Sequence, residues 1–254
     1  MGKNKKGVKM MGLIEDLIES VKKNDCEVKD VRVGVSWTGV WSKYCGLSKT
    51  YGIPVPHGNY TRDFGELIGK SSLELAKYVY SWNFIEASIG VAAINSMIDP
   101  KGKKSNALEF VIEKSKGKRV VMVGRFPKEE EVRKAAKDFK ILELDQYKIN
   151  PALGILPATA SEYVIPQSDM AVITGSTLIN KSLERLLSLS KESYTIVLGP
   201  STPMSEVLFD YGADVIAGVE VIKPIPIIKK ISQTGGMVSK RMCPGEIEYR
   251  ILEK

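Results

Sequence analysis

Two stretches of the chain combine an apolar run, a glycine-containing turn and hydroxyl side chains in the same order. They read AVITGSTLINKSLERLL (Ala171–Leu187) and TIVLGPSTPMSEVLF (Thr195–Phe209). The apolar run is typical of a buried strand, and the spacing after the turn is typical of a helix. The hydroxyl residues are therefore expected near helix N-termini, where free N–H groups and the helix dipole favour an anion.

The two turns together predict a ligand site. When strands are parallel, such turns lie side by side at the carboxyl edge of the sheet, where open α/β folds bind ligands. For each turn taken alone, capping of the following helix by Ser or Thr is the alternative explanation. Asn180 adds an amide to the first turn, unless it is an exposed helix residue. The expected ligand-binding residues are Thr174, Gly175, Ser176, Thr177, Asn180, Gly199, Pro200, Ser201 and Thr202.

A third predicted strand-to-helix turn follows VVMV and contains Gly124, Arg125 and Phe126, which we also expect at the site. A dinucleotide-binding turn would carry GxGxxG, but here one glycine stands before Phe126 and a proline, which obstruct a pyrophosphate. NAD is therefore disfavoured. A nucleoside stays open, because Glu143 and Asp145 end the next strand, where a carboxylate can accept hydrogen bonds from ribose hydroxyls. The alternative is that these carboxylates face solvent.

A carboxylate interrupts the predicted helix NFIEASIGVAAINSMI, which is apolar on nearly all sides and is therefore expected to be buried. Burying Glu86 is costly unless it is paired or used, so it is the candidate catalytic acid, base or metal contact. A structural ion pair with Lys or Arg is the alternative. Asn95 lies about 180° away on a straight helix, so the two cannot face one pocket, and Glu86 is preferred. His57 lies in a predicted loop that could reach a cleft, although a lone loop histidine is more often only exposed.

The composition excludes several classes of protein. The 254 residues, 43% of them hydrophobic, suffice for a core and for one or two domains. No apolar run reaches the roughly 18 residues of a membrane span, and four lysines among the first ten residues supply +4 of the net charge of +7. We therefore expect neither a membrane nor a nucleic-acid partner. Three scattered cysteines (Cys26, Cys45 and Cys243) and one histidine favour a cytoplasmic protein without a preformed metal cage.

The first part of the chain is predicted to be a basic tail (1–10) followed by an α+β domain (11–103). Apolar residues at helical spacing predict a helix over 12–23, and alternation predicts a strand over Asp30–Trp37. A turn at Thr38-Gly39 and a second strand over Val40–Leu47 would complete a hairpin. Helices are expected over 72–81 and 83–98, and the Pro- and Gly-containing segment 99–104 is expected to end the domain.

Strands and helices alternate from residue 104 onward, which predicts an α/β domain with a doubly wound parallel sheet over 104–254. Two prolines, Pro224 and Pro226, are expected to interrupt the helix after the fifth strand. The predicted strands are Arg119–Gly124, Lys140–Leu144, Met170–Thr174, Tyr194–Leu198, Ala213–Ala217 and a terminal strand over Glu246–Leu252.

Five segments of the chain resemble a prokaryotic family described as putative heavy-metal chelation proteins. They read WNFIEASIGVAAINS, VVMVGRFP, ILELD, DMAVITGSTLINKSLERLL and VLGPSTPMSEVLFDYGADVIAG. The resemblance implies an enolase-N-terminal-like domain followed by a Rossmann-like domain, with a ligand site between them. It also implies partial similarity of the second domain to methyltransferases. The implied role is condensation or hydrolysis in making pterin-, flavin- or siderophore-like metal-binding compounds.

Three functions follow as expectations. The leading one is binding of a small polar or anionic metabolite between the domains, with condensation, hydrolysis or group transfer connected with metal-chelating compounds. The second is a methyltransferase-like enzyme with S-adenosylmethionine as cofactor and Glu143 on the ribose. The third is a metal chaperone or sensor without catalysis. The identity of any metal ion and the formation of a homodimer stay open.

Overall fold

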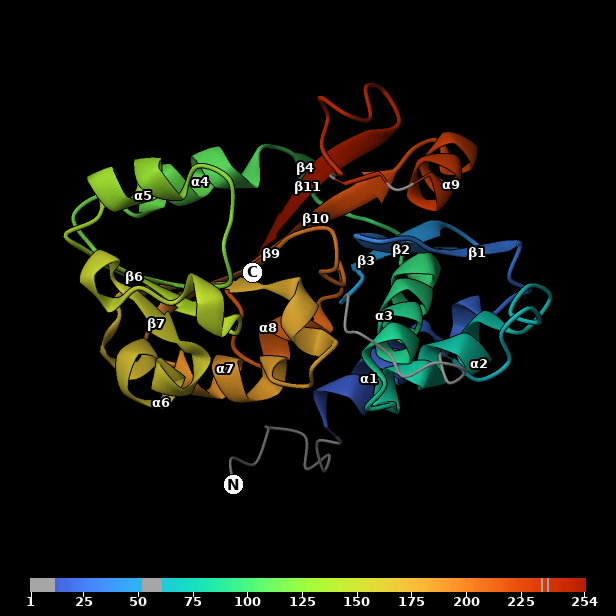
Figure 1. The fold of residues 1–254 in the computed structure, drawn as a ribbon, viewed down its shortest axis with the longest axis horizontal. Helices are drawn as coiled ribbons and strands as arrows, with labels where there is room; N and C mark the ends of the chain where they lie inside the picture. The colour runs from blue at the N-terminus through green and yellow to red at the C-terminus, as the bar shows by residue number, and fades with distance from the viewer. Residues whose placement is uncertain (1–11, 52–60, 234, 237) are drawn as a thin grey trace.

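The computed structural model describes residues 12–51, 61–233, 235–236 and 238–254. It contains a three-stranded antiparallel sheet in the N-terminal part and an eight-stranded, mostly parallel sheet in the C-terminal part (Figure 1). The expected α/β class is confirmed at this level. Within those residues, no helix is both long and apolar enough to cross a membrane.

The small sheet is a meander of β1 (Asp30–Val33), β2 (Trp37–Trp41) and β3 (Cys45–Lys49). One of its faces packs against α3 (Phe84–Met97), and the other is covered by α9 (Pro224–Ser232) from the far end of the chain (Figure 1). A helix of the C-terminal part therefore covers one face of the N-terminal sheet. The other helices of this part are α1 (Leu13–Val21), η1 (Lys22–Asn24), α2 (Ser72–Ala76) and η2 (Lys77–Tyr80).

The turn predicted at Thr38-Gly39 is wrong, because both residues lie inside β2. The chain turns between β1 and β2 instead, where the N–H of Gly34 donates to the carbonyl of Trp37. Gly39 is there for packing: a Cβ on it would lie 2.8 Å from Ile231 Cδ1 on α9. A glycine in a strand that lets a helix pack closely cannot be told from a turn glycine by its neighbours in the sequence alone.

The large sheet has the order β4-β11-β10-β9-β8-β5-β6-β7. From β7 to β10 all neighbouring strands are parallel, whereas β11 is antiparallel to β10 and β4 to β11. The direction of strand addition reverses between β5 and β8. The strands are β4 (Lys103–Lys104), β5 (Arg119–Val123), β6 (Asp138–Glu143), β7 (Ile155–Pro157), β8 (Met170–Thr174), β9 (Tyr194–Leu198), β10 (Val215–Val221) and β11 (Ile247–Glu253).

Helices cover both faces of this sheet. One face carries α4 (Ala107–Lys114) and α5 (Glu129–Ala135), and the other carries α6 (Ser161–Val164), α7 (Leu183–Leu189) and α8 (Val207–Asp210) (Figure 1). Pro224 is the first residue of α9, and Pro226 lies in the same first turn. The expected interruption is therefore wrong, since a proline at this position loses no helical hydrogen bond. Short 3₁₀ segments complete the fold: η3 (Gln146–Lys148), η4 (Pro151–Leu153), η5 (Ala158–Ala160), η6 (Ile165–Gln167) and η7 (Gly175–Leu178).

The two parts share one hydrophobic core. Successive residues of β5 point to opposite faces, so that Val120 and Met122 pack under α4 and α5. Val121 and Val123 belong instead to a cluster that also contains Leu17 of α1 and most of α3. Apolar burial across the boundary therefore holds the small sheet and its helices against the large sheet.

Candidate functional site

The loops after β5, β8 and β9 converge on Thr174, at the carboxyl edge of the large sheet where the strand order reverses. A Cβ on Gly175 would lie 2.4 Å from Thr202 Oγ1, so the loops after β8 and β9 touch at these residues. Gly124 (φ +85°) and Gly199 (φ +118°) adopt left-handed conformations beside Thr174. The expected meeting of the two hydroxyl-containing turns is therefore found, and Gly175 permits it.

The predicted helix N-termini are wrong in both turns. Thr174 caps the 3₁₀ segment η7, and the α-helix after β8 begins only at Leu183. After β9, Ser201 and Thr202 lie in a loop, since α8 begins at Val207. The next residues of this loop, Pro203 and Met204, are buried, and a Cβ on Gly218 of β10 would lie 2.7 Å from Met204 Sδ. The helix-dipole argument for anion binding therefore does not apply here.

Two of the five predicted hydroxyl side chains form hydrogen bonds inside the protein. Thr177 Oγ1 donates to the carbonyl of Thr174 at 2.6 Å. Ser201 Oγ accepts from the N–H of Lys49 at 2.8 Å. Both residues are almost fully buried. They fix the two loops and join β3 to the loop after β9.

Two other predicted hydroxyls, those of Thr174 and Ser176, form a row with Tyr51 that crosses from one part of the chain to the other. Ser176 Oγ lies 3.0 Å from Thr174 Oγ1 and 3.5 Å from the hydroxyl of Tyr51, which follows β3. We refer to Tyr51, Ser176 and Thr174 as the hydroxyl row. Burial raises the pKa of the Tyr51 phenol; the hydrogen bond with Ser176 lowers it in part, and the charge of Glu143 raises it further. The phenol therefore stays protonated at neutral pH and can donate a hydrogen bond.

Sequence reasoning missed Tyr51, although it directly follows a strand and precedes a loop. Its ring lies 5.6 Å from that of Phe84, between centroids, so α3 holds the phenol in place. Tyr51 and Phe84 are far apart in the sequence, and no local sequence pattern indicates their contact.

Asn95, and not Glu86, is the α3 residue that meets the loops. Its Nδ2 donates to the carbonyls of Leu47 (2.9 Å) and Ser201 (3.2 Å), one in each part of the chain. Two carbonyl acceptors fix the orientation of the amide, because a flipped amide would place its oxygen against both. Asn95 Oδ1 and Thr202 Oγ1 are buried without a hydrogen-bond partner in the described structure. They line a cavity of about 20 Å³ between β3 and this loop, the size of one water molecule.

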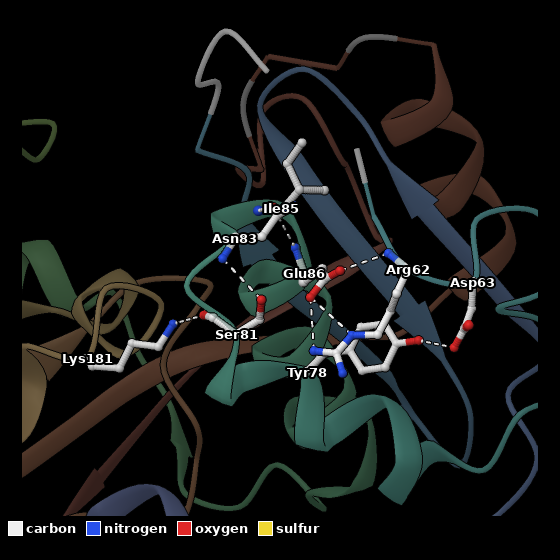
Figure 2. A network of polar contacts seen from close by, with 8 residues as sticks. All are labelled: Arg62, Asp63, Tyr78, Ser81, Asn83, Ile85, Glu86 and Lys181. Atoms are coloured by element: carbon white, nitrogen blue, oxygen red, sulfur yellow. Dashed lines mark hydrogen bonds and ion pairs between the residues drawn. The ribbon is translucent and has the colours of Figure 1, made fainter. Parts of the chain in front are cut away.

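Glu86 is engaged in an ion pair on another side of α3 (Figure 2). Its carboxylate accepts from the backbone N–H of Arg62 at 2.8 Å and from the Arg62 guanidinium at 2.9 and 3.1 Å. Burial raises the pKa of the Glu86 carboxyl, but hydrogen bonds from Ser81 and Arg62 and the charge of Arg62 outweigh it, so the pKa is lowered. The ion pair that the sequence left as an alternative is present. The catalytic role of Glu86 stays a prediction.

The same network links the two parts of the chain a second time. Lys181, which follows the loop after β8, donates to the carbonyl of Ser81 (Figure 2). It also donates to the carbonyl of Ile179 at 2.9 Å. Burial lowers the pKa of the Lys181 ammonium. The ammonium of Lys181 thus donates hydrogen bonds to two backbone carbonyls, which gives Lys181 a structural role.

The other predicted residues that the structure describes make their contacts outside the hydroxyl row. Arg125 forms an ion pair with Glu129, and Phe126 is partly buried against the core under α5. Glu143 Oε1 accepts from the N–H groups of the two residues that follow it. Asn180 Oδ1 accepts from the N–H and hydroxyl of Ser182 and so stabilises a turn. Pro200 lines the cavity, and His57 lies outside the described residues.

The described residues do not fit a resident metal ion. Within this part of the chain, no group of three or more His, Cys, Asp or Glu side chains is arranged to hold one. Cys45 and Cys243 are buried. Burial and the charge of Asp30 raise the pKa of the Cys45 thiol to about 12, so that it stays protonated.

Comparison with protein families identifies the class of protein. Residues 106–245 match a family described as "putative heavy-metal chelation". Residues 14–98 match a second family with the same description. The chain therefore belongs to the putative heavy-metal chelation family.

Individual relatives extend the match without naming a function. The chain is 28% identical to an uncharacterized protein of Methanocaldococcus jannaschii over 177 residues, and the match spans 65% of each chain. A solved structure with unknown function from Desulfitobacterium hafniense has a TM-score of 0.77 at 24% identity, covering 95% of this chain and 98% of that one. A second, from Pyrococcus horikoshii, has a TM-score of 0.76 at 20% identity with the same coverage. These likenesses concern the fold alone.

Replacing Asn95 by alanine should destabilise the junction of the two parts. The change leaves two carbonyls without their donor, and we expect the free energy of unfolding to fall by about 2–3 kcal/mol. Urea unfolding followed by circular dichroism measures this. Asn150→Ala, at an exposed position, is the control and should change the value by less than about 0.5 kcal/mol. Equal losses in the two variants would contradict the assignment.

The Glu86–Arg62 pair should make stability depend on pH. Because the pKa of Glu86 is lowered in the folded state, its contribution is present above the ordinary carboxyl pKa and is lost as pH falls through the folded value. Glu86→Gln should therefore cost about 1 kcal/mol at pH 7, and this difference should shrink toward pH 3. Glu131→Gln, at an exposed position of α5, should show neither effect. A pH-independent loss in Glu86→Gln would refute this explanation.

Proposed function

We propose that this protein binds a small polar or anionic metabolite at the carboxyl edge of the large sheet, where the two parts of the chain meet. The hydroxyl row is the observation that supports the proposal. Hydroxyl groups of both parts lie within hydrogen-bonding reach at the point where the strand order reverses. Open α/β sheets bind ligands at such a point.

The residues around the row suit a polar ligand. Thr174 and Tyr51 are only partly buried and Ser176 is 9% exposed, whereas Thr177 and Ser201, each 3% exposed, support the loops from inside. Left-handed glycines after β5 and β9 keep side chains away from Thr174. A ligand carbonyl, carboxylate or phosphate oxygen would accept hydrogen bonds from the phenol of Tyr51 and the hydroxyl of Ser176. The same donors would stabilise negative charge that develops on such an oxygen in condensation, hydrolysis or group transfer.

The finer classification of the two parts belongs to this proposal. The parallel strands β7-β6-β5-β8-β9-β10 follow the 3-2-1-4-5-6 order of a Rossmann fold when counted from β5. The helix-covered meander of the N-terminal part is compatible with an enolase-N-terminal-like domain. We place the domain limits near 11–103 and 104–254, and the interval between the two family matches, 14–98 and 106–245, supports a boundary there.

We propose that the ligand, and not a metal site of the protein, is what binds heavy metals. The family description concerns chelation, whereas the described residues offer no metal cage. A pterin-, flavin- or siderophore-like compound, or a precursor of one, reconciles the two observations. The protein would then make or modify a chelator, and a metal chaperone without catalysis becomes the weaker alternative.

A nucleoside cofactor such as S-adenosylmethionine is the second candidate. Glu143 ends β6, the strand beside β5, where an acidic residue of a dinucleotide fold binds ribose hydroxyls. One of its oxygens accepts two backbone N–H groups, which would leave the other for a ligand. A methyltransferase-like enzyme would use this position.

A ligand screen tests the main proposal. Thermal unfolding of the full chain should shift saturably with at least one compound among pterins, flavins, nucleosides and small carboxylates. Ser176→Ala and Tyr51→Phe should each weaken that compound about tenfold or more, because each removes one hydrogen bond. Ser20→Ala and Tyr163→Phe, at exposed positions away from the loops, should leave it unchanged. Equal affinity in all four variants would refute the site.

Calorimetry with S-adenosylmethionine tests the second candidate. Glu143→Gln should weaken binding about tenfold, since a neutral amide accepts a ribose hydrogen bond less strongly than a carboxylate. Glu131→Gln on the exposed side of α5 is the matched control. No heat of binding in the unmodified protein would remove this candidate and leave the main proposal standing.

A further inference from the structure

Lys49 is a half-buried cation at the junction of the two parts, and no described contact neutralises it. Lys49 and Lys181 are the lysines of the described chain whose pKa burial lowers. Lys181 donates to two carbonyls. The ammonium of Lys49 lies over the ring of Trp37, 5.4 Å from its centroid. An aromatic face attracts a cation but does not accept a strong hydrogen bond from it.

An acidic partner for Lys49 is missing from the described structure, where no carboxylate lies within 4 Å of its ammonium. The sequence of the other residues, 1–11, 52–60, 234 and 237, contains no Asp or Glu either. Taking a cation partly out of water is costly unless a counter-charge approaches it. Neither the described contacts nor the sequence of the other residues supplies a counter-charge for Lys49.

The backbone of Lys49 is fixed beside the predicted loops. Its N–H donates to Ser201 Oγ at 2.8 Å, and its carbonyl accepts from Ser88 Oγ at 2.8 Å. Tyr51, two residues further on, reaches Ser176. The side chain of Lys49 therefore starts from the same short segment that supplies the phenol of the hydroxyl row.

A second cation faces this segment. The charge of Lys148, the last residue of η3, is near enough to lower the pKa of Lys49 further. Lys148 forms an ion pair with Asp145, and Glu143 is the acidic group that acts on both Lys148 and Tyr51. Arg125 also lies within range of Glu143. Asp145 and Glu143 therefore each have a cation or N–H groups nearby, whereas Lys49 has no carboxylate partner among the described residues.

We propose that the ligand of this site carries a negatively charged oxygen, a carboxylate or a phosphate, and that Lys49 is the residue that binds it. The inference rests on the proposed function and narrows its ligand class to anions. Lys49 supplies the charge, and Tyr51 and Ser176 supply hydroxyl donors to the same group or to its neighbour. Lys49 and Tyr51 come from one short segment at the end of β3, where the strand contacts the loop after β9, and a cation together with hydroxyl donors suits such an oxygen.

The experiment uses inorganic phosphate and acetate as separate probes, each titrated into the full chain at constant ionic strength with sodium chloride. The thermal unfolding midpoint should rise saturably with at least one of them, and the stronger probe identifies the group. Lys49→Gln should abolish the saturable rise or weaken it about tenfold or more. Lys49→Arg keeps the charge and should retain part of the rise, which excludes a mere folding defect.

Lys43→Gln is the matched control. Lys43 lies in the turn between β2 and β3, and its ammonium, like that of Lys49, lies over an aromatic ring, here that of Tyr44. General salt stabilisation should appear equally in both glutamine variants. An identical saturable rise in Lys49→Gln and Lys43→Gln, or none in the unmodified protein, would overturn the inference. A neutral ligand that loses affinity in Tyr51→Phe but not in Lys49→Gln would overturn it while leaving the proposed function intact.

Discussion

The contact between the free edge of β3 and the loop after β9 is the constraint on which the site depends. An edge strand presents unpaired N–H and C=O groups. Here the N–H of Lys49 binds the hydroxyl of Ser201, and the amide of Asn95 joins the carbonyls of Leu47 and Ser201. The loop after β9 is thereby fixed to the N-terminal part. Through the close approach of Gly175 and Thr202, the loop after β8 is fixed as well.

The parts of the fold that the sequence predicts best are those whose pattern has one physical cause. Strands Met170–Thr174 and Tyr194–Leu198 were predicted residue for residue, because burial on both faces requires a continuous apolar run. The turn predicted at Gly39 and the interruption predicted at Pro224 were wrong, because glycine occurs both in turns and at close contacts, and proline both breaks and begins helices. Gly39 admits α9 against the sheet, and Pro224 begins a helix that it was expected to interrupt.

The candidate site could be predicted only as far as its loops. The sequence correctly requires that Glu86 and Asn95 face different ways, but α3 is apolar on all sides, so its pattern does not say which residue faces the loops. That choice is made by Arg62, which pairs with Glu86, and by the carbonyls that meet Asn95. Tyr51 and Lys49 were missed for the same reason: contacts between distant segments leave no local signature.

The continuous core also constrains how a ligand can be received. Separate domains joined by a small polar interface move easily relative to each other. Here α9 covers the N-terminal sheet, and apolar residues of α1 and α3 share a cluster with β5, β8 and β9. Opening the two parts would expose that cluster to water at a large cost in free energy. The hydroxyl row and Lys49 are therefore held in place before any ligand arrives, which favours a preformed site over one assembled by closure of the two parts.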